Sequence, residues 1–307
     1  MLERTKVDPA SVGLARVDLA IVILNYNVRD LLRACLRSIE RSATRLRAEV
    51  WVVDNGSDDD SIALVRQEFP GVNLRTSENG GYARGNNLAL REILARASGH
   101  GLPRYVLLLN PDTELPPRAL DEMVTLLDER PEFGAAGPKL VLPDGSLDLA
   151  CRRGFPTPFV SLCHFAGLAR LFPRSPRFSR YNLTFLDPNA VTEVDAVAGA
   201  FMLVRGAVLA KVGVLDESFF MYGEDLDLAL RIRQAGWKVL YNGEVAVLHH
   251  KRASSKQRQT QSVIAFYQAM LIFFRKHYAA RTAWPVRWLV VAGIHLWGAL
   301  ALARHGR

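Results

Sequence analysis

The chain has 307 residues, of which 49% are hydrophobic and 23% charged, so it can bury a large core in one big domain or two small ones. Its three cysteines, Cys35, Cys151 and Cys163, show neither an even disulfide framework nor a metal-binding spacing. This excludes a disulfide-stapled scaffold and favours a reducing compartment. Acidic and basic residues precede the first apolar run, and we therefore expect no signal peptide.

The net charge of +8 is concentrated at the C-terminal end. No Asp or Glu follows Glu244, whereas ten Lys and Arg residues do, which leaves the part up to Glu244 at −2. Such a basic segment is typical of binding either to nucleic acid or to an anionic membrane. Because apolar residues are interleaved with the basic ones, we favour the membrane and expect no nucleic-acid partner.

Strands and helices alternate regularly in the first half of the chain, after a loose leader at 1–17. Short apolar runs predict the strands, and apolar residues at helical spacing predict the helices between them. The expected strands are 19–24, 50–53, 72–74 and 105–109, and the expected helices are 28–41, 57–69 and 85–97. This alternation predicts an α/β fold with a mostly parallel sheet that is covered by helices on both faces.

The second half of the chain is less regular. Residues 145–180 contain four prolines and six arginines, which indicates a loop-rich insertion. The elements expected from here on are a short helix near 159–171, strand-like residues over 194–204, a helix at 224–235, strands at 237–241 and 245–248, and a helical remainder from about 259.

The strand expected at 105–109 is followed at once by Asn110, Pro111 and Asp112, which cannot continue it. Pro111 lacks an N–H and favours an extended conformation at Asn110, so Asp112 is held just beyond the carboxyl end of the strand. Ligands bind at this edge of open α/β sheets, and a carboxylate there suits a divalent cation and its phosphates. Alternatively, Asp112 caps a helix that starts near Pro116.

Two glycine-containing turns follow other strands and carry groups that can contact a nucleotide. The turn at 54–57 presents amide and carboxylate groups that can pair with a base edge or a ribose, or can simply cap the next helix. The stretch 78–87 contains three glycines, which permit close backbone approach, and it opens a helix whose N–H groups favour phosphate. It is neither a Walker loop nor a dinucleotide fingerprint.

Acidic residues gather at the start of one predicted helix. Asp227 lies four residues before Arg231 and is expected to pair with it in a structural role. Glu224 and Asp225 stand at the helix start, where a carboxylate either projects into a cleft as a general base or caps the helix. His249, at the end of a predicted strand, is either a metal ligand or a hydrogen-bonded structural residue.

In their order and spacing, these motifs resemble those of the inverting family-2 glycosyltransferases, which have the GT-A fold. The motifs are Ile23–Asn27, Val53–Ser57, Asn79–Tyr82, Asn110–Asp112 and the block that runs from Asp216 through Gly223–Asp227 to Trp237. The resemblance covers about 18–255 and is closest to the subgroup that includes bacterial rhamnosyltransferases of surface-polysaccharide assembly.

The resemblance implies a role for each motif. Asp225 would be the catalytic base, with Glu224 beside it as the rival. Asp112 and His249 would bind Mg²⁺ or Mn²⁺ against the donor diphosphate. The donor-binding residues would be Asn25, Tyr26, Asp54, Asn55, Gly80, Gly81, Asn86, Asn110 and Asp112.

The resemblance also implies a division of the chain. A GT-A domain would span 18–257, with a nucleotide-binding half at 18–115 and an acceptor half at 116–257. A basic amphipathic and apolar helical tail would follow at 258–307.

The implied reaction moves a sugar from a nucleotide-diphosphate donor to a saccharide or polyprenyl-linked acceptor in cell-surface polysaccharide synthesis. Within the subgroup, the expected donor is dTDP-rhamnose, which supplies L-rhamnose. The enzyme would be cytoplasmic and peripheral to the inner face of the cell membrane, whose anionic surface the tail would bind.

The chain departs from the family pattern at three points. Asn110 replaces the first carboxylate of the metal-binding motif, and Asn55 stands where many relatives have a second Asp. Ala196 and Ala198 stand where the subgroup often has Trp and Ser near the acceptor.

Two other functions remain open. One is a catalytically silent module that binds sugar nucleotides or glycans at the membrane, against which the complete set of candidate catalytic residues argues. The other is a sugar nucleotidyltransferase, but that class usually begins with a Gly-rich nucleotide loop, which Ile23–Asn27 lacks.

The last apolar run, 288–303, is short for a membrane span, which needs about 20 apolar residues. Before it, Ile264, Tyr267, Leu271 and Phe274 recur at helical spacing next to basic residues, as in a basic amphipathic helix. We therefore expect the tail to lie at the membrane interface or to be buried against the domain rather than to span the bilayer.

Overall fold

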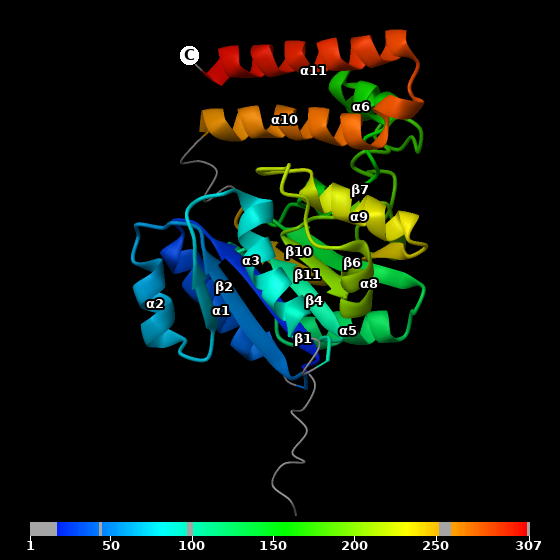
Figure 1. The fold of residues 1–307 in the computed structure, drawn as a ribbon. Helices are drawn as coiled ribbons and strands as arrows, with labels where there is room; N and C mark the ends of the chain where they lie inside the picture. Colours follow the sequence, from blue (N-terminus) through cyan, green and yellow to red (C-terminus); the bar gives the residue numbers. More distant parts are fainter. Residues whose placement is uncertain (1–16, 43–44, 97–100, 252–258, 306–307) are drawn as a thin grey trace, which may run out of the picture.

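Figure 1 shows the fold in a computed structural model, which describes residues 17–42, 45–96, 101–251 and 259–305. Within these ranges a central mixed sheet of nine strands has the order β3-β2-β1-β4-β10-β6-β11-β5, with β8 paired to β11. Helices cover both faces of this sheet, as predicted. The predicted leader lies outside the described residues, except for Val17.

The first half of the chain builds four parallel strands that are connected by helices. Its elements are β1 (Leu19–Asn25), α1 (Arg29–Ser42), β2 (Ala48–Asp54), α2 (Ser61–Glu68), β3 (Asn73–Thr76), α3 (Tyr82–Ala95) and β4 (Tyr105–Leu109). β1 lies between β2 and β4, and all seven of its residues are buried. Burial on both faces explains its continuous apolar sequence. Every element predicted for this half is confirmed, with ends shifted by up to four residues.

The largest shift is at the start of α2, because Ser57 is used in a turn instead of in the helix. The N–H of Ser57 donates to Oδ1 of Asp54 at 2.8 Å, and its Oγ accepts the N–H of Asn27 at 3.0 Å. These bonds tie the turn after β2 to the turn after β1, so that two strand ends carrying predicted site residues are held side by side.

The second half extends the sheet with strands of both directions. Its elements are β5 (Thr113–Glu114), α5 (Ala119–Asp128), β6 (Phe133–Val141), η2 (Leu149–Cys151), β7 (Arg152–Arg153), α6 (Pro158–Phe165), α7 (Leu168–Leu171), β8 (Val191–Val194), β9 (Ala196–Val197), β10 (Phe201–Arg205), α8 (Gly206–Val212), α9 (Glu224–Gln234) and β11 (Lys238–His249). β10 is antiparallel to β4 and β6, whereas β6 and β11 are parallel. β7 and β9 form a separate antiparallel pair.

Several expectations for this half are corrected. The two strands expected over 237–248 are the single strand β11, whose register shifts between Asn242 and Ala246. The strand-like stretch 194–204 is interrupted at Gly199, between β9 and β10. We did not predict β6, because its two glycines, two alanines and one proline give it little strand propensity; contacts on both sides hold it in the sheet.

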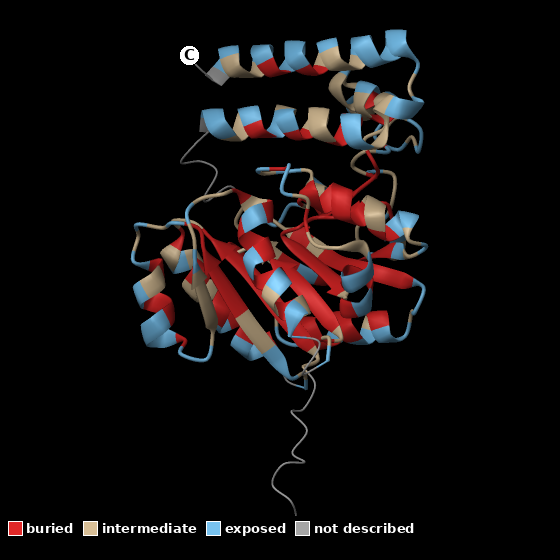
Figure 2. Ribbon diagram, in the orientation of Figure 1, coloured by how far each residue is buried: buried red, intermediate tan, exposed pale blue. Residues whose placement is uncertain are grey.

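The hydrophobic core follows the sheet, whose central strands are buried (Figure 2), whereas β3 and β8 are mostly half-buried. Trp51, Tyr105, Phe201 and Tyr241 are the largest apolar side chains with almost no exposed surface. Burying one such side chain stabilises the fold by about 1.5–3 kcal/mol. Buried polar residues, in contrast, gather at the carboxyl ends of the parallel strands, where they define the candidate site.

The chain ends in two helices that lie side by side above the sheet, α10 (Gln259–His277) and α11 (Trp284–His305), joined by the turn η4 (Ala279–Arg281) (Figure 1). α10 belongs to the domain's packing, because its Ala269 and Phe273 join the main core. In addition, Nε2 of His277 lies 2.7 Å from Oδ1 of Asp227 in α9. The helix α10 therefore touches the element that begins with the candidate base.

α11 packs against α10 and leaves most of its surface exposed. The part Trp284–Arg304 has a mean hydropathy of 1.6, and only 11% of its most apolar stretch is buried. With 22 residues, α11 is about 33 Å long, so it could cross a membrane by length and composition. The apolar run 288–303 is thus part of a longer helix than we expected. The alternative that this run is buried against the domain is wrong, because most of it is exposed.

Candidate active site

The polar ends of β1 and β2 form one hydrogen-bonded group. Nδ2 of Asn25 donates to Oδ2 of Asp54 at 2.9 Å and to Oγ of Ser57 at 3.2 Å. Asn55 extends the group to the glycine-rich loop, since its Oδ1 accepts the N–H of Gly80 at 3.3 Å. Tyr26 follows directly after β1 and is half-buried. The structure therefore brings the predicted residues of these two strand ends together.

The glycine-rich loop is held by the backbone of a distant segment. The N–H of Tyr82 donates to the carbonyl oxygen of Phe220 at 2.6 Å. Gly81 has φ +90°, and a Cβ there would lie 2.3 Å from that same carbonyl oxygen, so only glycine fits. Asn86, in the first turns of α3, is buried and donates to the carbonyl oxygen of Tyr82 at 2.9 Å. Close packing within the protein is thus one reason for Gly81.

Asp112 and His249 meet at the carboxyl end of β4. The N–H of His250 donates to the backbone carbonyl of Asp112 at 2.8 Å, next to the pairing of β5 with β11. As a result, Nε2 of His249 lies 3.4 Å from Oδ1 of Asp112. The alternative interpretation of Asp112 as a helix cap is wrong, because α5 begins only at Ala119, after Arg118.

This corner fits two ligands of one divalent cation. Adjacent ligands of an octahedral Mg²⁺ with bonds of about 2.1 Å are about 3 Å apart, close to the distance between Asp112 and His249. Oδ1 of the neighbouring Asn110 is buried and has no hydrogen-bond partner, so it is available to a ligand. No group of three or more His, Cys, Asp and Glu residues that could hold a metal occurs among the described residues. Most of the coordination shell would therefore come from outside the protein.

Asp225 is held by contacts from two other elements. Its Oδ2 accepts the N–H of Gly199 at 2.9 Å and lies 2.5 Å from Nη2 of Arg153 in β7. The buried guanidinium compensates a negative charge on Asp225 where water has little access. Sequence analysis missed Arg153, because it lies in a short strand of the loop-rich insertion, where no periodicity or motif marks it.

Glu224 is buried beside Asp225 but has a different environment. Burial and the neighbouring charge of Asp225 raise the pKa of Glu224 to about 8. Its Oε2 has no hydrogen-bond partner. The two adjacent carboxyl groups therefore differ: Asp225 is paired with the guanidinium of Arg153, and Glu224 keeps its proton at neutral pH.

Tyr82 connects the acidic pair with the metal corner. Its hydroxyl donates to the carbonyl oxygen of Gly199 at 3.0 Å. Burial raises the pKa of Tyr82, and the charges of Glu224, Asp225 and Asp112 raise it further. All three carboxyl groups therefore act on this half-buried tyrosine.

Buried polar atoms without partners are concentrated in this region. Such an atom costs about 1–3 kcal/mol unless a ligand or water satisfies it. Of the atoms of this kind in the described part of the chain, those that belong to predicted site residues are Oδ1 of Asn25, Asn86 and Asn110 and Oε2 of Glu224. The pattern indicates a site that is completed by a polar ligand.

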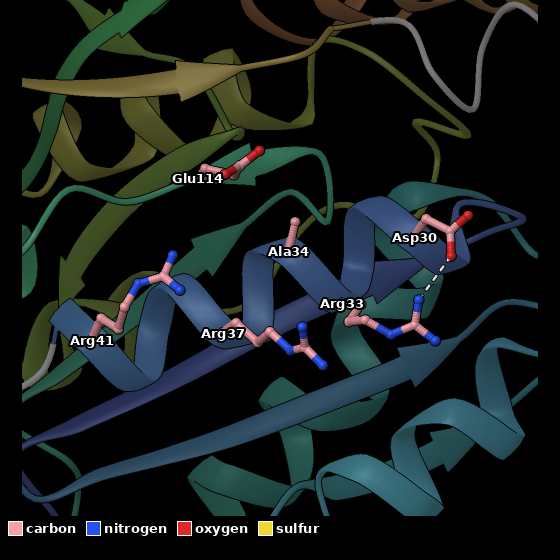
Figure 3. Close-up of a pocket in the computed structure, with 6 residues that line it drawn as sticks. All are labelled: Asp30, Arg33, Ala34, Arg37, Arg41 and Glu114. Atoms are coloured by element: carbon pink, nitrogen blue, oxygen red, sulfur yellow. Dashed lines mark hydrogen bonds and ion pairs between the residues drawn. The ribbon is translucent and has the colours of Figure 1, made fainter.

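A groove on the outer side of α1 lies apart from these residues (Figure 3). It is lined by Asp30, Arg33, Ala34, Arg37, Arg41 and Glu114. Most of its charged groups already have partners, since Arg33 and Arg37 pair with Glu68, and Glu114 lies 2.7 Å from His250. It contains none of the predicted site residues.

Comparison with known proteins shows which family the chain belongs to. The model of a family described as "Glycosyltransferase like family 2" matches residues 15–263. The chain belongs to this family. Its central sheet with flanking helices is accordingly of the GT-A type, and the predicted resemblance is confirmed.

This glycosyltransferase is similar to named rhamnosyltransferases. It is 31% identical to the N-acetylglucosaminyl-diphospho-decaprenol L-rhamnosyltransferase of Mycobacterium tuberculosis, over 94% of this chain and 92% of the relative. It is 24% identical to the rhamnosyltransferase WbbL of Escherichia coli, over 75% of this chain and 82% of the relative. Among solved structures, the mannosyltransferase PcManGT of Pyrobaculum calidifontis in complex with GDP-Man and Mn²⁺ has a TM-score of 0.55 at 21% identity, covering 95% of this chain and 73% of that chain.

The raised pKa of Glu224 makes the stability of this glycosyltransferase depend on pH. The native Glu224 keeps its proton up to a pH of about 8, whereas the unfolded chain releases it at the ordinary value of 4.5. Between these values the unfolded state binds fewer protons, so this residue lowers the free energy of unfolding as the pH rises. We expect Glu224→Gln to raise the melting temperature at pH 8 by about 1.5 °C for each kcal/mol recovered, and to have less effect at pH 5.

Thermal denaturation of the ligand-free protein from pH 5 to 8.5 measures this difference. Asp216→Asn is a useful comparison, because Lys276 lowers the pKa of Asp216 to about 2 and so excludes it from this pH window, although burial opposes that shift. Equal pH profiles for Glu224→Gln and the wild type would contradict a protonated native Glu224.

Proposed function

We propose that this glycosyltransferase moves a sugar from a nucleotide diphosphate to a hydroxyl of a lipid-linked saccharide and inverts the anomeric carbon. The observation that carries the proposal is that Asp225 and the Asp112–His249 pair lie on either side of one backbone segment. Asp225 and Tyr82 both bind Gly199, and the N–H of Asn110 donates to the carbonyl oxygen of Ala200 at 3.0 Å. A proton acceptor and a diphosphate-binding corner in the same site are what a direct displacement needs.

The donor would lie across the carboxyl ends of β1, β2 and β4. Its nucleotide would contact the group formed by Asn25, Tyr26, Asp54 and Asn55, and its remainder would pass the loop with Gly80 and Gly81 toward the metal corner. The unpartnered Oδ1 atoms of Asn25, Asn86 and Asn110 support this path. Residues 18–115 would thus form the nucleotide-binding half, 116–257 the acceptor half, and 258–307 the membrane-associating tail.

Asp225 would act as the base. The acceptor oxygen attacks the anomeric carbon and forms the new C–O bond while the bond to the diphosphate oxygen breaks. Asp225 takes the hydroxyl proton, and the electron pair of the broken bond leaves with the diphosphate. No covalent sugar–enzyme bond is needed, and one displacement inverts the centre. Glu224 is less suited to this role, since a group that keeps its proton at neutral pH does not accept another.

A divalent cation, Mg²⁺ or Mn²⁺, would stabilise the charge of the leaving diphosphate. Asp112 and His249 would hold it, and the diphosphate oxygens would supply further ligands. The solved mannosyltransferase contains Mn²⁺, and so does GalNAc-T7, whose structure has a TM-score of 0.54 at 14% identity over 76% of this chain. These neighbours support the binding of a divalent cation, but they do not distinguish Mg²⁺ from Mn²⁺ for this enzyme.

The proposed donor sugar is L-rhamnose from dTDP-rhamnose, and the proposed acceptor is a polyprenyl-diphosphate-linked saccharide of cell-surface polysaccharide synthesis. The mycobacterial relative supports both, because its name specifies L-rhamnose and a decaprenol-linked N-acetylglucosaminyl diphosphate. The name of the Escherichia coli relative supports the sugar.

A lipid-linked acceptor requires the enzyme to reach a membrane, and α11 offers the surface. Trp284, Trp288 and Leu289 are each about 70% exposed. Aromatic and basic residues of this kind favour the interface of an anionic bilayer. We propose that α11 lies along the cytoplasmic face rather than crossing the bilayer, because it packs against α10, where a Cβ on Gly298 would lie 3.2 Å from the ring of Tyr267.

A catalytically silent sugar-nucleotide or glycan-binding module remains the alternative. The enzyme is favoured because the site holds a candidate proton acceptor, Asp225, together with the Asp112–His249 corner for a leaving diphosphate.

The base assignment predicts a loss of turnover in Asp225→Asn. We expect kcat to fall ~10²–10⁴-fold, the usual contribution of a general base, with the donor dissociation constant changed less than about threefold. Initial rates with donor and acceptor, together with donor titration of each variant, measure the two effects. Glu224→Gln is the matched control and should retain far more activity. A larger loss of kcat in Glu224→Gln than in Asp225→Asn would assign the base to Glu224.

The two-ligand corner predicts that metal and donor bind together. We expect Mn²⁺ alone to change the melting temperature little and a nucleoside diphosphate alone to raise it, while the two together raise it most, since a ligand of the native state stabilises by mass action. Asp112→Ala and His249→Ala should lose only the increment due to Mn²⁺. A thermal-shift panel of nucleotides and nucleotide sugars, with and without Mn²⁺, tests this. Tight binding of Mn²⁺ by the donor-free protein would contradict it.

The membrane role of α11 predicts that polar substitutions on its exposed side release the protein. We expect the triple variant Trp284→Gln, Trp288→Gln, Leu289→Gln to fold normally and to bind anionic phosphatidylglycerol vesicles at least ~10-fold more weakly, since each lost side chain forfeits up to ~1.5–3 kcal/mol. Vesicle co-sedimentation and the melting temperature measure both properties. Leu88→Gln on α3, also an exposed leucine, is the control. If the triple variant sedimented with vesicles as the wild type does, the proposed contact of α11 with the membrane would be wrong.

A further inference from the structure

We infer that Asp148 is a positioning residue for the metal ligand His249. It would fix the proton of the imidazole on Nδ1 and thereby direct the lone pair of Nε2 toward the cation beside Asp112. The inference rests on the proposed function, and no sequence motif assigns Asp148 any role.

The contact is buried and joins distant parts of the chain. Oδ2 of Asp148 lies 3.0 Å from Nδ1 of His249, across 101 positions of sequence. Asp148 is 1% exposed and His249 is 6% exposed. Water therefore competes little for this hydrogen bond, and the ring has a fixed orientation.

The other carboxylate oxygen of Asp148 is also occupied. Oδ1 accepts the N–H of Ala150 at 3.0 Å, at the start of η2, and lies 2.5 Å from Nζ of Lys251. Because the ammonium group of Lys251 and the N–H of Ala150 both meet Oδ1, the surroundings of Asp148 favour an ionised carboxylate. The carboxylate is thus itself fixed before it orients the imidazole.

The chemistry of the two groups determines which imidazole nitrogen carries the proton. An ionised carboxylate only accepts hydrogen bonds, so Nδ1 of His249 must donate to Asp148. A ring that binds a cation through Nε2 is neutral and carries its one proton on Nδ1, and Nε2 is the atom 3.4 Å from Asp112. A second carboxylate on the far nitrogen is how proteins commonly orient metal-binding histidines and make them better ligands.

A purely structural role would have a different consequence. If Asp148 only capped η2 and anchored the end of β11 through Lys251, its loss would lower stability and leave the intrinsic metal affinity of the folded protein unchanged. Metal affinity of the folded variant, rather than activity, therefore separates the two roles.

The test compares Asp148→Asn with Lys251→Met. The asparagine keeps the size and the acceptor for Ala150 but removes the charge that fixes the imidazole proton, whereas Lys251→Met removes the neighbouring ion pair and leaves the contact with His249. The affinity for Mn²⁺ is titrated by electron paramagnetic resonance in the presence of the nucleoside diphosphate that gives the largest thermal shift. We expect Asp148→Asn to weaken Mn²⁺ binding ~10–100-fold and Lys251→Met to weaken it less than about threefold.

The double variant Asp148→Asn, His249→Ala completes the comparison. Its affinity for Mn²⁺ should equal that of His249→Ala alone, because Asp148 acts only through the imidazole. A folded Asp148→Asn protein that binds Mn²⁺ within about twofold of the wild type would overturn the inference. Absence of nucleotide-dependent Mn²⁺ binding in the wild type would instead overturn the proposed metal site itself.

A measurement on the wild-type protein covers the case in which Asp148→Asn does not fold. Nitrogen-15 spectra of histidine-labelled protein with Mg²⁺ and the nucleoside diphosphate, assigned with His249→Ala, report which nitrogen of His249 carries the proton. A proton on Nδ1 is expected, and a proton on Nε2 would refute the inference.

Discussion

The arrangement of the site depends on one electrostatic constraint: Glu224 and Asp225 are buried side by side, and Arg153 contacts Asp225 at hydrogen-bonding distance. Two like charges side by side repel by several kcal/mol where water has little access, so both acids cannot ionise there at low cost. Arg153 and the N–H of Gly199 both bind Asp225, whereas Glu224 keeps its proton. Two chemically similar residues thus acquire different properties, and only one of them is suited to accept a proton.

The complete site requires the second half of the chain to fold onto the first. Arg153 comes from β7, and Gly199 from the link between β9 and β10, while Asp112 follows β4. Because β10 pairs with β4 in antiparallel direction, the start of β10 lies at the carboxyl end of β4. The metal corner depends on a similar pairing, in which the short β5 brings Asp112 and His249 together at the end of β11. Mixed strand directions, rather than parallel strands alone, assemble the catalytic groups.

The C-terminal helices are connected to the same region. Asp227, two residues after Asp225, is fully buried and accepts from Arg231 at 2.8 Å, which confirms the pairing predicted from their spacing. It also contacts His277 and Lys276 of α10, each at 2.7 Å. α10 therefore supports the helix that begins with Glu224 and Asp225, and α11, the outer helix, leaves most of its apolar surface exposed. The contacts of α10 with α11 and with Asp227 connect this exposed surface to the helix of the candidate base.

The sequence by itself determined the alternation of strands and helices, the corner at Asn110–Asp112 and the acids at the start of α9, because burial on two faces, proline geometry and helix capping leave local patterns. The sequence also identified the family, because the order and spacing of the motifs can be read without a structure. Only the tertiary structure showed the different environments of Asp225 and Glu224, removed the helix-cap interpretation of Asp112, and revealed Arg153 and Asp148. Those residues act through contacts across 72 and 101 positions of sequence. No local pattern encodes such contacts, because the charge state of a buried group depends on what other segments place next to it.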